Sequence, residues 1–353
     1  MSKWIDVDLN ERQIMIRRVS QEKNFADSAA EKDWWVTLCI KAIFSMPYAP
    51  YMLFKGGTSL SKGWNIISRF SEDIDLTISQ RFFLEQLHLL FANCENNQQI
   101  KKLRIASRDF ITGVFCPQLN QTIRQLGVVD FVLEPVTQVE KSDGTFASVD
   151  HDSDPTTLLL KYTSIATHQY DYVSPVVKIE ISCLGMDEPF EVRRLSSLIS
   201  EYFPEEDDEM IIDVPTVMPT RTFLEKAFLL NEEFQRNVPR SLRMSRHLYD
   251  LEKIMSTPYA AEALQSEELY DQIVAHRRRF YHVGGVDYDK DMPKEINFIP
   301  QGELASRFRA DYEAMLHTYI YDQTSALTYD ELIQRLEHLQ EQFRSTKAFA
   351  TTE

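Results

Sequence analysis

Long apolar runs, paired cysteines and a surplus of basic residues are all missing from this sequence, and each absence excludes a class of protein. No apolar run approaches the roughly 18 to 20 residues of a membrane span. The opening residues, MSKWIDVDLNERQ, lack the apolar region of a secretory signal. The cysteines are scattered, lie mostly in apolar contexts and show no metal-site spacing: Cys39, Cys94, Cys116 and Cys183. We therefore expect a cytoplasmic protein with core thiols and no membrane partner.

The shortage of basic residues limits the partners that the whole surface can attract. Lys and Arg number 38 against 54 Asp and Glu, which gives a formal net charge of −16. Non-specific affinity for nucleic acid comes from phosphates neutralised by Lys and Arg. A protein that coats nucleic acid is therefore excluded, although a local basic surface is not. The acidic run at residues 205–209 (EEDDE) predicts an exposed loop between two halves of the chain.

The most informative stretch that is present is residues 55–76, KGGTSLSKGWNIISRFSEDIDL. Residues 73–78 (DIDLTI) predict a strand, and its period of two places Asp73 and Asp75 on one face, with the apolar side chains on the other. Two carboxylates on one face repel each other unless a cation is supplied. Mg²⁺ fits this pair because it prefers one or two carboxylates together with phosphate oxygens of a substrate.

The glycine pair Gly56-Gly57 supplies the second half of this pattern. An apolar stretch precedes the pair, and apolar residues at helical spacing follow it, so we predict a strand that passes through a tight turn into a helix. Backbone N–H groups at such a turn favour a phosphate, and Thr58 and Ser59 add hydroxyl donors. It is not a Walker A loop, because Lys62 precedes Gly63. A plain turn beside a solvated Asp pair is the alternative, but the two halves together favour metal-dependent nucleotidyl transfer.

Three regions follow from the patterns along the chain: a helical segment at 1–46, a mixed nucleotidyltransferase core at 47–213 and a helical domain at 214–353. Within the core, residues 156–165 and 176–184 predict a β-hairpin. Glu180 lies on the face opposite its apolar neighbours, where it can join the Asp pair as a third metal ligand. Exposure of that face to solvent is the alternative. The fold class is therefore α+β.

The chain resembles the AbiEii/AbiGii toxin family of nucleotidyltransferases, within the polymerase-β-like superfamily that includes the MenT toxins. The segments that carry the resemblance are 31–37 (EKDWWVT), 55–60 (KGGTSL), 69–76 (RFSEDIDL), 224–227 (LEKA) and 246–251 (RHLYDL), with a weaker one at 311–315 (DYEAM). The resemblance implies a polymerase-β-like core, with N-terminal helices and a helical C-terminal domain that completes the active site.

The same resemblance implies roles for particular residues. Gly56, Gly57, Thr58 and Ser59 would hold the nucleoside triphosphate, Asp73 and Asp75 would bind Mg²⁺, and Lys226 and Asp250 would complete the catalytic set. An ammonium near the triphosphate offsets the charge that builds on the leaving pyrophosphate. Without the resemblance, Lys226 is an ordinary solvated helix residue. Asp250 is then a helical partner of Arg246; within the family it would orient Lys226 or Arg246, or act as a base.

The function that the resemblance implies is Mg²⁺-dependent transfer of a nucleoside monophosphate from an NTP to RNA, with a tRNA 3′ end as acceptor. The protein would be the toxin of a type IV-like toxin–antitoxin or phage-defence system, with a cognate antitoxin as partner. Two alternatives stay open: transfer to a protein hydroxyl, and a catalytically silent nucleotide-binding scaffold.

Overall fold

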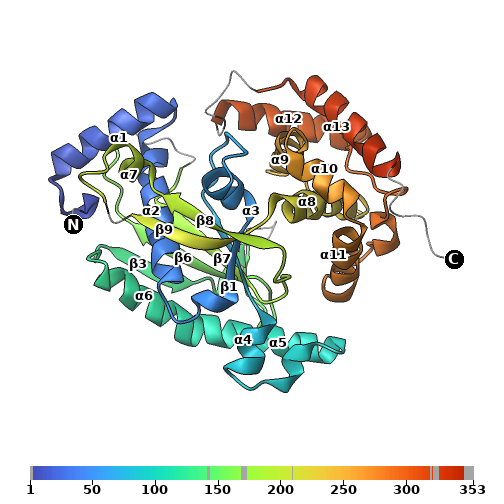
Figure 1. The fold of residues 1–353 in the computed structure, drawn as a ribbon, viewed down its shortest axis with the longest axis horizontal. Helices are drawn as coiled ribbons and strands as arrows, with labels where there is room; N and C mark the ends of the chain where they lie inside the picture. Colours follow the sequence, from blue (N-terminus) through green and yellow to red (C-terminus); the bar gives the residue numbers. More distant parts are fainter. Residues whose placement is uncertain are drawn as a thin grey trace. The chain divides into compact units, whose positions relative to one another are not determined.

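The chain folds into two compact units, the first formed by Met1–Gly63 and Ser71–Thr216 and the second by Trp64–Phe70 and Val217–Glu353. A computed structural model describes residues 3–140, 144–167, 173–208, 210–318, 320 and 326–345 (Figure 1). Among these residues no helix is both long and apolar enough to cross a membrane. The three-part division predicted from the sequence stays a prediction.

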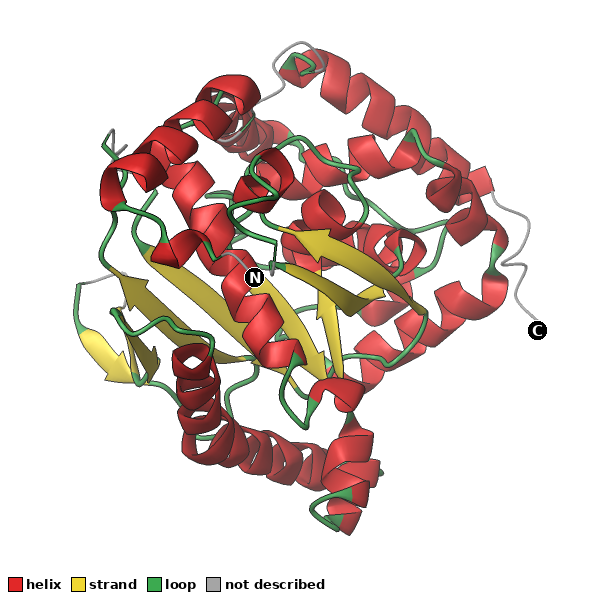
Figure 2. Ribbon diagram, turned by 60° about the vertical axis from the view of Figure 1, so that its left-hand side comes forward, coloured by secondary structure: helices red, strands yellow, loops and turns green. Residues whose placement is uncertain are grey.

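The first unit is built on a mixed seven-stranded sheet in the order β3-β6-β7-β2-β1-β9-β8, drawn yellow in Figure 2. Its strands are β1 (Met52–Lys55), β2 (Ile74–Ile78), β3 (Phe131–Pro135), β6 (Thr156–Tyr162), β7 (Val176–Ser182), β8 (Phe190–Ser196) and β9 (Ile211–Val217). β4 (Gln138–Glu140) and β5 (Phe146–Ser148) form a separate pair. The α+β class is confirmed, and β6 and β7 pair antiparallel as the predicted hairpin.

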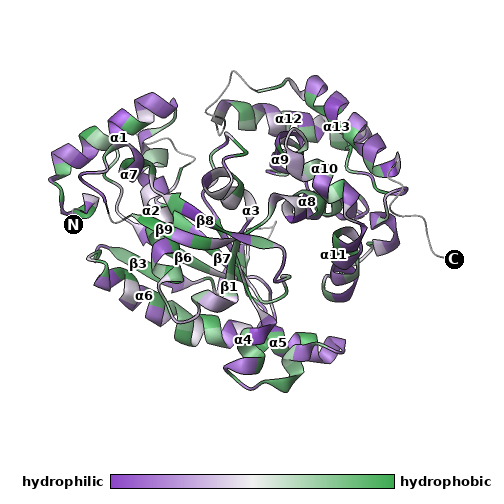
Figure 3. Cartoon of the chain, viewed as in Figure 1, coloured by the Kyte–Doolittle hydropathy of each residue, from purple (hydrophilic) through white to green (hydrophobic). Residues whose placement is uncertain are grey.

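Helices flank this sheet because one of its faces is apolar along every central strand. Ile74, Leu76 and Ile179 are fully buried on that face, and Figure 3 shows hydrophobic colouring on the labelled strands β6 and β7. Trp35 of α2 stacks on Tyr162 of β6 with ring centroids 4.6 Å apart, so α2 covers the apolar face. The helical elements of this unit are η1 (Trp4–Asp6), α1 (Leu9–Lys23), α2 (Asp27–Phe44), η2 (Ala49–Tyr51), α3 (Gly56–Thr58), η3 (Ser59–Gly63), α4 (Gln80–Glu85), η4 (Leu90–Asn93), α5 (Asn97–Phe110), η5 (Ile111–Phe115), α6 (Cys116–Gln125) and α7 (Leu198–Tyr202).

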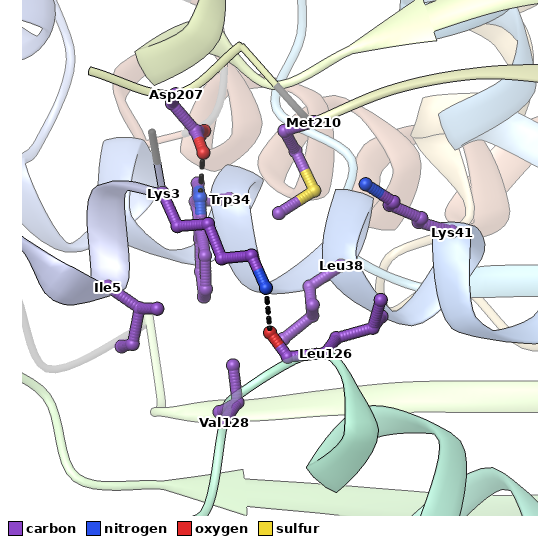
Figure 4. A pocket seen from close by; sticks show the side chains of 9 residues that line it. All are labelled: Lys3, Ile5, Trp34, Leu38, Lys41, Leu126, Val128, Asp207 and Met210. Atoms are coloured by element: carbon purple, nitrogen blue, oxygen red, sulfur yellow. Dashed lines mark hydrogen bonds between the residues drawn. The ribbon is translucent and has the colours of Figure 1, made fainter. Parts of the chain in front are cut away.

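The acidic run after α7 departs from the sequence-based prediction at one residue. Asp207 is only 1% exposed, so an exposed loop is wrong for this position. Its carboxylate accepts hydrogen bonds from the Trp34 indole at 3.0 Å and the Trp4 backbone N–H at 3.3 Å. Figure 4 shows the Trp34 bond beside a cavity of about 20 Å³. Such a cavity has room for about one water molecule and none for a nucleotide. The four cysteines are buried thiols, as predicted.

The second unit is helical, with α8 (Pro219–Phe234), α9 (Ser245–Met255), α10 (Pro258–Gln265), α11 (Glu267–Phe280), η6 (Tyr288–Asp291), α12 (Gly302–Thr318) and α13 (Tyr329–Ser345). Its interior holds a charged cluster between α8, α11 and η6. The Arg277 guanidinium donates to Glu232 at 2.7 Å. The Asn231 amide donates to the fully buried Asp291 at 2.8 Å. Burial and the neighbouring charge of Glu232 raise the pKa of Asp291 to about 7.

This buried carboxyl makes stability depend on pH. The folded protein favours the protonated form of Asp291, because its folded-state pKa lies above the unfolded value of about 3.9. The contribution of Asp291 to the free energy of unfolding is therefore complete below about pH 3.9 and is lost as pH rises through about 7. In that window the free energy of unfolding of the wild type falls by up to about 1.4 kcal/mol per pH unit because of Asp291. Urea unfolding of Asp291→Asn from pH 5 to 8 should lose this slope, and the variant should be more stable than wild type at pH 8. Asp271→Asn, exposed on α11, should keep the slope; an unchanged slope in both variants would contradict the assignment.

Candidate active site

The glycine turn lies directly against the second aspartate of the Asp pair. β1 ends at Lys55, and Gly56 opens the helical turn with φ of +79°, a conformation that glycine adopts without strain. A Cβ atom on Gly56 would lie 2.0 Å from Asp75 Oδ2, closer than any real contact. Both the backbone conformation and the space therefore require glycine here. The turn and the carboxylate form one piece of structure.

The hydroxyls of the turn hold the loop that leads to Asp73. Thr58 donates to the Asp73 carbonyl at 2.5 Å and contacts the Ser71 hydroxyl at 3.0 Å. Ser59 donates to the Gly56 carbonyl at 2.8 Å, and both side chains are fully buried. The two hydroxyls thus have partners within the protein. The Ser59 backbone N–H also donates to the Gly56 carbonyl, so contact with phosphate depends on the Thr58 backbone N–H, in the first turn of a helical segment.

A row of charged residues crosses three adjacent strands on one face of the sheet. The register pairs Lys55 of β1 with Asp75 of β2, and Asp75 with Glu180 of β7. Directly paired residues lie on the same face, and Asp73, just before β2, shares that face with Asp75. Glu180 therefore lies beside the Asp pair, as its strand pattern predicted.

Glu180 already has a cationic partner. Its carboxylate lies 2.9 Å from the Lys178 ammonium. In the described part of the chain, no group of three or more His, Cys, Asp or Glu side chains is arranged to hold a metal. The role of Glu180 as a third metal ligand stays a prediction.

The carboxylate oxygens of Asp73 and Asp75 are of the kind that Mg²⁺ prefers. Asp73 and Asp75 are half-buried carboxylates on one face, and Mg²⁺ usually takes one or two carboxylates and completes its shell with water and substrate phosphates. The glycine turn places backbone against one of these carboxylates. The residues present therefore match a metal–triphosphate complex better than a metal bound by protein ligands alone.

Within the second unit, Lys226 and Asp250 lie together with Arg69, a residue that was not predicted from the sequence. Asp250 is fully buried on α9. Arg69 binds it in a bidentate pair, Nε to Oδ1 and Nη2 to Oδ2, both at 2.7 Å. Lys226 of α8 lies 2.8 Å from the same Oδ2. Both carboxylate oxygens of Asp250 therefore contact a cation.

Burial and mutual charge set the protonation of this cluster. Burial works to raise the pKa of Asp250, but the charges of Arg69 and Lys226 outweigh it and hold that pKa below its usual value. Burial lowers the pKa of Lys226, Asp250 opposes this, and Arg69 adds to the lowering. His247, whose Nδ1 lies 3.5 Å from the lysine Nζ, has a pKa well below its ordinary value because of burial and the Lys226 charge. At neutral pH the histidine is uncharged and the carboxylate is ionised.

The sequence contained one signal for Arg69, its position four residues before Asp73 in the segment RFSEDIDL. Its pairing with Asp250 joins residues 181 positions apart. Local patterning carries no information about so distant a partner. The segment Trp64–Phe70, which contains Arg69, belongs to the second unit although both of its flanks belong to the first.

Gly56→Ala tests the glycine turn. We expect it to lower transfer activity about 10²-fold, the cost of a misplacement of roughly 1 Å, because Asp75 or the turn must move. Left-handed strain should also lower the free energy of unfolding by about 1–3 kcal/mol. Initial rates and urea unfolding measure the two effects. Gly113→Ala is the control, because a Cβ atom there meets nothing within 4 Å. Equal losses of activity in both variants would contradict a specific role for the glycine turn.

Comparison with known proteins places the chain. The sequence profile described as "Nucleotidyl transferase AbiEii toxin, Type IV TA system" matches residues 41–342. No curated protein matches the chain. Among solved structures, the nucleotidyltransferase toxin MenT4 from Mycobacterium tuberculosis H37Rv is similar at 16% identity and a TM-score of 0.44, over 94% of this chain and 99% of that one. On the match of the profile over most of its length, the chain belongs to the AbiEii family of nucleotidyltransferase toxins of type IV toxin–antitoxin systems.

Proposed function

We propose that this protein transfers a nucleoside monophosphate from an NTP to RNA, with a tRNA 3′ end as acceptor, in a Mg²⁺-dependent reaction. One observation supports this most strongly: the Gly56 turn lies against the Asp75 carboxylate, so a phosphate cradle and a metal ligand are built together. In the cell the protein acts as a toxin, and a cognate antitoxin restrains it. Both parts of that role are typical of the family whose profile matches the chain.

The reaction forms a bond between an acceptor hydroxyl oxygen and the α-phosphorus of the NTP. It breaks the bond between the α-phosphorus and the oxygen that bridges the α- and β-phosphates. Pyrophosphate leaves, and the hydroxyl loses its proton. Asp73 and Asp75 would hold Mg²⁺ through their carboxylates, and the ion would supply charge neutralisation for the displacement. With the ion held there, the two carboxylates would orient the triphosphate. The backbone of Gly56, Gly57 and Thr58 binds its phosphates, and Ser59 holds the turn through its bonds to the Gly56 carbonyl.

Lys226 offsets negative charge on the departing pyrophosphate. Its ammonium is held by Asp250, whose second cation, Arg69, fixes the carboxylate from the other side. Because Asp250 is ionised, buried and doubly occupied, its proposed role is to orient Lys226. A base that receives the acceptor proton needs an accessible oxygen, and Asp250 has none exposed.

The acceptor is tested by incubating the protein with each radiolabelled NTP, Mg²⁺ and total tRNA. We expect label from at least one NTP in an RNase-sensitive, protease-resistant band, lost in Asp73→Ala. Label in a protease-sensitive band would instead identify a protein hydroxyl as acceptor. NTP binding without label in either band would support the silent scaffold and overturn the proposal.

A further inference from the structure

We propose that two neighbouring residues of α2, Lys32 and Asp33, are positioning residues. From the apolar face of the sheet they hold two segments in place: residues 71–73 before β2, here called the metal loop, and residues 56–63, here called the phosphate turn. The inference deepens the proposed function and rests on it. Neither residue touches the face that carries the Asp pair. Lys32 acts through Glu72, which directly precedes Asp73, and Asp33 acts through Lys62, which lies about one helical turn after the glycine turn.

Lys32 acts on the loop that begins the metal-binding strand. Its ammonium lies 2.5 Å from Glu72 Oε2, and the two side chains are 3% and 11% exposed. Glu72 directly precedes Asp73, and the alternation along the segment points it to the opposite side, toward α2. Three carboxylates thus fall within four residues, at 72, 73 and 75. Lys32 neutralises the one that faces away, which leaves two for the metal.

The same ammonium also ties in the neighbouring strand. Lys32 donates to the Ser174 carbonyl at 3.1 Å, just before β7 begins. β7 pairs in parallel with β2, and it carries Glu180 beside Asp75. The loop before Asp73 is therefore fixed from both sides, by Lys32 through Glu72 and by Thr58 through the Asp73 carbonyl.

Asp33 acts on the phosphate turn. It accepts from the Lys62 ammonium at 2.6 Å, with both side chains largely buried, at 10% and 12% exposure. Lys62 lies in η3, the helical turn that continues from Gly56-Gly57-Thr58. The second Asp33 oxygen accepts the Leu198 N–H at 2.7 Å, so the carboxylate is fixed in orientation. Adjacent helix residues thus hold the end of the glycine turn and the start of the metal loop.

The residue before this pair offers a matched control. Glu31 is equally buried on α2, at 1% exposure. Its carboxylate accepts from the Ser164 hydroxyl and from the Ile165 backbone, in the segment that follows β6, which belongs to neither motif. Glu31→Gln should therefore perturb stability without changing the affinity for metal.

The experiment measures binding of Mn²⁺ alone by electron paramagnetic resonance of the free ion, which is independent of catalysis. Lys32→Met should weaken binding about 10–100-fold, the range found when partners behind metal ligands are removed. Lys32→Arg should retain most of the affinity. Adding Glu72→Gln to Lys32→Met should restore most of the loss, because the uncompensated carboxylate is then gone. Asp33→Asn should raise the NTP KM with a smaller change in kcat.

Each outcome bears on a different claim. If Lys32→Met and Glu31→Gln bind Mn²⁺ as wild type does, while Asp73→Ala does not, the positioning role is overturned and the proposed function stands. The role is also overturned if the double variant is no better than Lys32→Met. If wild type itself neither binds Mn²⁺ nor transfers label, the proposed function falls, and this inference falls with it.

Discussion

Asp73→Asn and Asp75→Asn are each expected to reduce nucleotidyl transfer by about 10³-fold, because each removes a charge on which the proposed reaction depends. The fold should persist. Asparagine keeps the shape of the side chain and removes a like-charge repulsion on that face of the sheet. Single-turnover rates with labelled NTP measure the loss, and thermal unfolding measures the fold.

Asp130→Asn is the matched control for these variants. Asp130 is an exposed aspartate directly before a strand, β3, as Asp73 is directly before β2. Its replacement should leave the rate unchanged. A rate loss in Asp130→Asn, or full activity in Asp73→Asn, would remove the Asp pair from the mechanism.

The second large effect is on stability: Asp250→Ala should lower the free energy of unfolding by about 3–5 kcal/mol, because it leaves two buried cations without their counter-ion. Those cations are Arg69 and Lys226. Urea unfolding measures the loss. The control is Asp330→Ala, which also removes a bidentate partner of an arginine, Arg309. That pair is exposed to solvent, so its loss should cost much less than the loss of Asp250.

The pH dependence of the Asp250 effect follows from the direction of its pKa. Because the folded-state pKa lies below the unfolded value of about 3.9, the stabilisation is present above that pH and is lost as pH falls through the folded pKa. The stability gap between wild type and Asp250→Asn should therefore be constant from pH 8 to 5 and narrow under strongly acidic conditions. A gap that narrows toward neutral pH would mean that Asp250 is protonated in the native state.

Local patterns predicted the parts of the fold that depend on local chemistry. Alternation placed Asp75 and Glu180 on the correct faces of their strands, and the glycine pair marked a turn that only glycine can form. Neither pattern contains the register between strands. The contact of Gly56 with Asp75 therefore emerged only when β1 and β2 were seen paired.

Charged residues were the hardest to place from sequence. Arg69, Lys32 and Asp207 look like solvated residues in their local context, yet each is buried. Burial of a charged side chain requires a partner of opposite charge. The partners of Arg69 and Lys32 lie 181 and 40 residues away along the sequence. The exposed loop expected at Asp207 was wrong for this reason, because the sequence gives no sign that an indole donor is nearby.

The insertion of Trp64–Phe70 into the second unit has a consequence for biosynthesis. The ribosome makes this segment before any other part of that unit, whose remaining residues begin at Val217. At about 5–20 residues per second, Arg69 waits on the order of 10 s or more for Asp250 to be synthesised. A nascent chain that ends before α9 lacks Asp250, the carboxylate that Arg69 binds in the finished protein, so we expect the second unit to fold only late in translation. A toxin with this connectivity stays incomplete while it is still being made.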